Sequence, residues 1–71
     1  MTTQLGNNGN QLAWIMHNEG ILKNGMTVEQ CEIEAKKEIA TTEQQQKWMQ
    51  NDDFWEDFIY RSEELGYQLK M

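Results

Sequence analysis

Helix start signals recur at short intervals along this sequence, and they constrain the fold more than any other feature. Thr27 with Gln30, and Thr42 with Gln45, have the S/T-x-x-E/Q spacing of a capping box. A capping box satisfies backbone donors at a helix N-terminus. Asn51 precedes a third segment with helical periodicity. Helices that start this close together are short, so we expect an all-α chain of short elements.

The chain has 71 residues and few means of covalent stabilisation. This length supports one domain, and a core of that size gives marginal stability. Cys31 is the only cysteine, which excludes an intrachain disulfide. With His17 it supplies two ligands, whereas structural zinc sites use four. The remaining sources of stability are close helix packing, self-association or a partner.

The predicted fold is a compact bundle of three or four short helices, with residues 1–9 as a flexible N-terminal segment and 10–71 as a single small helical domain. Periodicity and caps place the helices at about 11–19 after Asn10, about 28–40, after Thr42, and about 52–65. The alternative for the middle of the chain is one helix over 28–50. The break is favoured, because 41–47 has no large apolar residue.

The segment 21–28 and the C-terminal tail have two interpretations each. Asn24-Gly25 is a strong hairpin signal, but the flanking arms are very short. We therefore favour a plain helix–helix connection over a hairpin-like turn. The tail after Gly66 is predicted to fray, and the alternative is that Tyr67 and Leu69 fold back onto the core.

Most of the net charge of −6 lies at the C-terminal end. Residues 51–71 carry six acids against Arg61 and Lys70, which leaves −4. On a helical wheel the six acids fall within an arc of about 140°, and Phe54 and Phe58 fall on the opposite side. This pattern predicts an amphipathic helix whose outer face is anionic.

Two interpretations of the anionic face compete. Charged helix faces usually solvate a small protein, and we weight this interpretation more heavily. The other is a binding surface for a basic partner, with the carboxylates imitating DNA phosphates. The candidate partner-binding residues are Asp52, Asp53, Glu56, Asp57, Tyr60, Glu63, Glu64 and Trp48.

The functional hypothesis is a small acidic, non-enzymatic protein-binding module, of the kind found as phage- or mobile-element-type inhibitors and adaptors. It would occupy a basic surface of a host protein, such as one that normally holds nucleic acid, and would not itself bind DNA. The alternative is a helix-turn-helix-like DNA-binding regulator formed by the first two helices. Against it stand the long connection and the acids of the second helix.

Catalysis, cofactors and membrane insertion have little support in the sequence. His17 and Ser62 form no recognisable triad, and Cys31 lies on an apolar stripe with no basic neighbour marked. We expect no enzyme activity, no cofactor and no metal. No segment approaches the length of a membrane span or resembles a signal peptide, so a cytoplasmic protein is expected. Three tryptophans are many for so small a core, which makes a homodimer an alternative partner arrangement.

Overall fold

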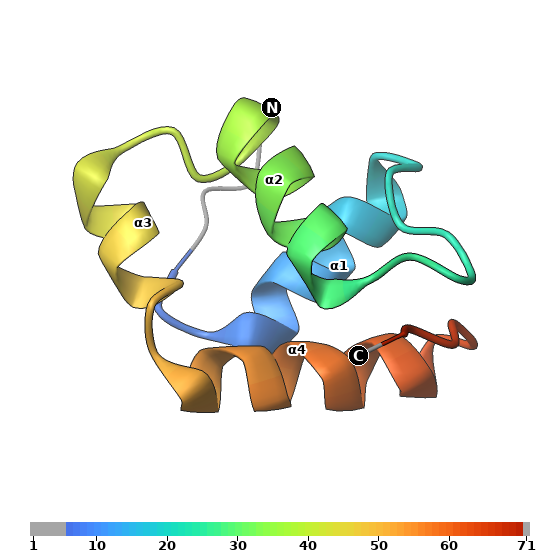
Figure 1. Cartoon of the computed structure of the whole chain (residues 1–71). Helices are drawn as coiled ribbons and strands as arrows, with labels where there is room; N and C mark the ends of the chain where they lie inside the picture. The colour runs from blue at the N-terminus through green and yellow to red at the C-terminus, as the bar shows by residue number, and fades with distance from the viewer. Residues whose placement is uncertain (1–5, 71) are drawn as a thin grey trace.

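The computed structural model describes residues 6–70, and this part of the chain is all-α. Its helices pack around one apolar cluster, with α4 along one side and the other helices on the opposite side (Figure 1). The predicted helical bundle is therefore confirmed. The elements are α1 (Gly9–Asn18), α2 (Val28–Glu38), α3 (Glu43–Trp48) and α4 (Asp52–Glu64).

The first helix begins two residues earlier than predicted. Asn8, and not Asn10, is the N-cap, and its side chain accepts a hydrogen bond from the backbone N–H of Asn10. Gly9 starts the helix and is buried against α4, where a Cβ would lie 2.7 Å from the backbone nitrogen of Phe58. Asn8 and Gly9, which the prediction placed in the flexible segment, therefore form the cap and the first residue of the helix. In the rest of the predicted flexible segment, the Gly6 backbone N–H donates to Gln11 Oε1 at 2.7 Å, and residues 1–5 lie outside the described residues.

The predicted break between the second and third helices is confirmed, and a single helix over 28–50 is wrong. Both capping boxes form, at Thr27 with Gln30 and at Thr42 with Gln45. Ala40 is fully buried at the break, and its carbonyl oxygen accepts a hydrogen bond from the Gln46 side chain. The chain can turn here because that carbonyl, which no longer has a helical partner, is satisfied.

The core lies mainly between α1 and α4, which form the principal helix–helix interface. Leu12, Met16 and Phe58 are completely buried there. Ala13 is also completely buried at this interface. Cys31 joins the same cluster from α2, so one core serves the whole of the described chain.

The connection after α1 contains no hairpin; within residues 6–70 the C-terminal tail pairs with it instead. An isolated parallel bridge joins Thr27 to Lys70, and the two segments run side by side in Figure 1. Tyr67 and Leu69 pack against the core. The prediction of a frayed tail is wrong and the folded-back alternative is confirmed. Pairing depends on the turn at Gly66, whose φ of 101° favours glycine.

None of the helices in the described part of the chain combines the length and the apolar character needed to cross a bilayer.

Candidate functional site on the outer face of the last helix

The last helix is positioned by one apolar side. Asn51 caps it, and its side chain accepts a hydrogen bond from the backbone N–H of Asp53. Phe54, Phe58 and Ser62 are buried at intervals of four residues. This spacing puts them on one stripe of the helix, facing the core. The opposite side of the helix is therefore left to solvent.

The start of α4 is held by aromatic packing. The Trp55 indole N–H donates a hydrogen bond to the Met49 carbonyl oxygen at 2.5 Å. Its ring packs edge-on against Phe54 and Phe58, with centroids 5.3 and 5.2 Å away. Edge-to-face pairs of this kind stabilise the arrangement beyond the burial of their area. The helix orientation, and with it the outer face, is fixed relative to the loop that precedes it.

We define the acidic face as the six carboxylates on the outer side of α4. All six are exposed, in agreement with the helical-wheel prediction. Tyr60 lies in the same arc, and 64% of its surface is exposed. The members of the acidic face are Asp52, Asp53, Glu56, Asp57, Glu63 and Glu64.

The acidic face has little local charge compensation. Within residues 6–70 its only ion pair joins Arg61 to Glu64, with 3.0 Å between nitrogen and oxygen. The acids of α2 differ, because both of its lysines pair with glutamates on the same helix. The acidic face therefore presents a concentrated negative potential, which in a folded protein attracts cationic groups.

Trp48 is the one candidate partner-binding residue that is half-buried, while the others are exposed to solvent. It is the last residue of α3 and packs against the core. Its sequence position next to the acidic helix could not reveal this packing. Trp48 can contact a partner only with its remaining exposed edge.

The residues considered for catalysis are engaged structurally. His17 Nδ1 lies 2.7 Å from the Tyr67 hydroxyl, and the His17 ring packs edge-on against Trp14 and Tyr67. Cys31 is completely buried, and burial raises the pKa of its thiol to about 11. A thiol with a raised pKa remains protonated and is a poor nucleophile at neutral pH. No three His, Cys, Asp or Glu side chains among the described residues gather to hold a metal ion.

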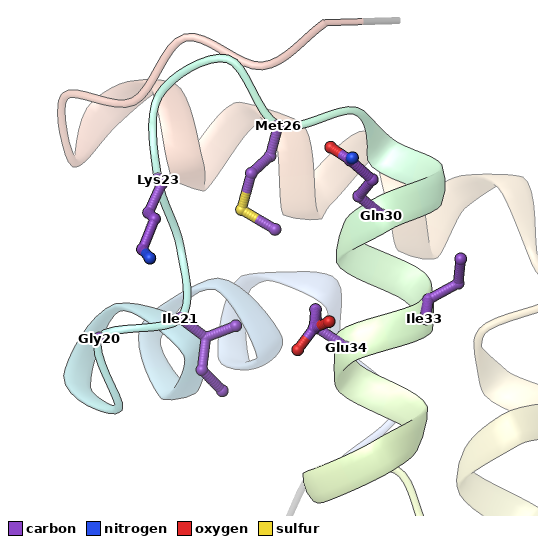
Figure 2. A pocket seen from close by; sticks show the side chains of 7 residues that line it. All are labelled: Gly20, Ile21, Lys23, Met26, Gln30, Ile33 and Glu34. Atoms are coloured by element: carbon purple, nitrogen blue, oxygen red, sulfur yellow. The ribbon is translucent and has the colours of Figure 1, made fainter.

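An open groove of about 600 Å³ was not anticipated from the sequence. It lies between the 20–26 loop and α2, and Figure 2 shows the side chains that line it. Ile21 and Met26 come from the loop, while Gln30, Ile33 and Glu34 come from α2. The only sequence signal was that Ile33 lies off the apolar stripe of its helix; half of its surface, 49%, is exposed.

No family model, curated protein or solved structure matches this chain.

Proposed function

We propose that this protein is a small non-enzymatic protein-binding module whose acidic face occupies a basic surface of another protein. The single observation that carries the proposal is the set of six exposed carboxylates on one side of α4, of which only Glu64 forms an ion pair within the described residues. Rows of like charge at i, i+4 spacing destabilise a helix, and solvated helices usually intersperse cations. A face retained at that cost is consistent with selection for binding.

The spacing of the charges supports a partner that normally holds nucleic acid. From Asp52 to Glu64 the helix rises about 18 Å, at about 1.5 Å per residue. The six carboxylates occur as three adjacent pairs over that length, and their mean spacing of about 3.6 Å along the axis is close to the ~3.4 Å per phosphate along one DNA strand. Proteins that position DNA through backbone contacts recognise such charge rows without reading bases.

The protein would act as an inhibitor or adaptor of the phage or mobile-element kind, in the cytoplasm, by blocking a basic surface. Tyr60 and the exposed edge of Trp48 would flank the carboxylates, since tyrosine and tryptophan are enriched among the residues that dominate interface energy.

Charge reversal within the acidic face tests the proposal. Asp53→Lys combined with Asp57→Lys puts two cations in the middle of the face and leaves the buried side of α4 unchanged. Wild-type protein and this variant are used as baits in a bacterial lysate, and captured proteins are identified by mass spectrometry. We expect basic, nucleic-acid-binding proteins to be captured by the wild type, with at least about tenfold less recovered by the variant, which corresponds to about 1.4 kcal/mol.

The matched control makes the same change of charge elsewhere. Glu19→Lys with Glu38→Lys alters two exposed acids at the C-terminal ends of α1 and α2, where cations suit the helix dipole. This control should capture the same proteins as the wild type. Equal capture by all three baits would mean that the acidic face only solvates the protein.

The helix-turn-helix alternative has a separate test. The connection between α1 and α2, residues 19–27, is longer than the three or four residues that usually join the two helices of that motif. The exposed residues of α2 include Glu29 and Glu38, which would face DNA phosphates. We expect no shift of duplex DNA by the protein alone at low salt. Tight binding in that assay would contradict the acidic-face proposal and favour the alternative.

A further inference from the structure

The exposed turn at Asn24-Gly25 contains a reactive pair of groups. In such a dipeptide the glycine has no side chain to shield its backbone nitrogen from the preceding carboxamide. Both residues are exposed, and Gly25 has a φ of 87°. The chain contains one more dipeptide of this type, Asn8-Gly9, at the start of α1. The two sites differ in what surrounds them.

The C-terminal tail holds both reacting groups of the turn. The backbone N–H of Gln68 donates to Asn24 Oδ1 at 2.8 Å. The backbone N–H of Gly25 donates to the Gln68 carbonyl oxygen, also at 2.8 Å. Beyond this pair, the Lys70 N–H donates to the Met26 carbonyl oxygen at 2.8 Å. The carboxamide and the backbone nitrogen are thus each tied to the same tail residue.

We propose that Asn24 is a site of intramolecular deamidation and that the tail, residues 67–70, controls its rate. The Gly25 nitrogen forms a bond to Asn24 Cγ and gives up its proton, while the side-chain nitrogen leaves as ammonia. Water then adds to one of the two carbonyl carbons of the resulting five-membered imide, the bond from that carbon to the imide nitrogen breaks, and the nitrogen takes up a proton. The products carry aspartate or isoaspartate at position 24, each with one added negative charge.

The reaction requires the tail to open. The Gly25 nitrogen cannot reach Cγ while its N–H is held by the Gln68 carbonyl, and the carboxamide must turn away from the Gln68 N–H. Exposed segments open locally far more often than the whole protein unfolds. Asn8-Gly9 lacks this route, because Gly9 is buried against the backbone of α4. Its release requires separation of α1 from α4.

The test removes one hydrogen bond of the tail. Gln68→Pro eliminates the N–H from which Asn24 Oδ1 accepts, and it keeps the carbonyl to which the Gly25 N–H donates. Loss of one such bond increases the open population by about fivefold, and the deamidation rate at Asn24 should rise by the same factor. Peptide mapping by mass spectrometry, during incubation in mildly alkaline buffer, measures both products.

Two comparisons isolate the role of the tail. Gln68→Ala keeps both backbone groups of that residue and should leave the rate at Asn24 unchanged. Asn8 in the same molecules reports global unfolding, and its rate should remain at the wild-type value. If the deamidation rates at Asn8 and Asn24 rise together in Gln68→Pro, that variant has destabilised the whole protein. Lys70→Pro is then measured in its place, because it removes only the hydrogen bond from the Lys70 N–H to the Met26 carbonyl oxygen. A deamidation rate at Asn24 that is the same in the wild type and in the proline variant measured would overturn the proposal.

Discussion

Gly9 decides how closely α1 and α4 approach. The backbone of α4 passes close to the Gly9 Cα. A Cβ at this position would lie 2.7 Å from the Phe58 nitrogen and 2.9 Å from the Phe54 carbonyl carbon. Backbone atoms cannot yield as a flexible side chain can. This contact fixes the crossing of the two helices that contain most of the core, and thereby the side of α4 that faces solvent.

Gly9→Ala should therefore be among the most damaging single-methyl changes in the protein. Overpacking of this kind costs typically about 1–3 kcal/mol, and the rigid neighbours place this site at the upper end. Urea unfolding followed by circular dichroism measures the loss. Gly20→Ala is the comparison, since a Cβ there meets open space and only the φ of 74° opposes it. A smaller loss for Gly9→Ala than for Gly20→Ala would contradict the close-contact argument.

The thiol of Cys31 gives a pH-dependent contribution to stability. Burial raises its pKa from 9.0 to about 11, so the folded state holds the thiol proton more tightly than the unfolded state. The contribution is complete below pH 9.0 and is lost as the pH rises through about 11. We expect the free energy of unfolding to fall across this window by more in wild type than in Cys31→Ala. Parallel curves for the two proteins, from denaturant titrations at each pH, would contradict this expectation.

At the scale of the element, α4 has a conflict between its charges and its dipole. Asp52 and Asp53 lie in the first turn, where acids are favourable. Glu63 and Glu64 lie at the other end, where the dipole favours cations. Arg61 compensates Glu64, whereas Glu63 has no ion pair within the described chain. The acidic face is thus extended into the last turn against the local electrostatic preference.

Opposite effects on stability are expected from neutralising the two ends. Glu63→Gln should raise the free energy of unfolding by about 0.3–1 kcal/mol at low ionic strength. Asp53→Asn should lower it by less, because the change also relieves the repulsion from Asp57. Thermal denaturation in dilute buffer measures both, and added salt should reduce both effects. If Glu63→Gln also weakens partner capture, binding and stability oppose each other at this residue, as they do at many functional sites. Destabilisation by both changes would contradict the dipole argument.

At the scale of the whole molecule, repulsion within the excess negative charge opposes folding. The i, i+4 pairs Asp52–Glu56 and Asp53–Asp57 each cost about 0.2–0.5 kcal/mol at low salt. Raising the ionic strength from about 0.01 M to about 0.15 M shortens the Debye length from about 30 to about 8 Å and should stabilise the protein by up to about 1 kcal/mol. Denaturant titrations at the two salt concentrations measure this change.

A second double charge reversal supplies the control for the salt effect. Asp53→Lys with Glu56→Lys changes the net charge by +4, from −6 to −2, and turns both repulsive pairs into pairs of opposite charge. Its stability should respond much less to salt. If salt stabilises the two proteins equally, the repulsion that salt screens does not come from the acidic face.

Self-association through exposed apolar side chains is a further property of the whole molecule. Trp14 and Ile33 remain 44% and 49% exposed, so the homodimer alternative has apolar side chains available to it. Light scattering over a dilution series distinguishes a dimer from a monomer whose mass does not change with concentration.

The starts of α2 and α3 and the composition of the acidic face follow from the sequence alone. Capping boxes at Thr27 and Thr42 act within four residues, so the helix starts are local properties of the chain. The separation of the six carboxylates from Phe54 and Phe58 follows from helical geometry alone. Only the assignment of Trp48 among the candidate residues required the tertiary structure, because its burial depends on the shared core.

The tertiary structure decided the contacts between segments distant in the chain. Gly9 meets the backbone of α4 more than forty positions away, and Gln68 joins Asn24 across 44 residues. No local pattern encodes either contact, because each depends on how the helices pack. The sequence thus specifies which side of α4 is acidic, and packing of the opposite side against α1 determines that this side faces solvent.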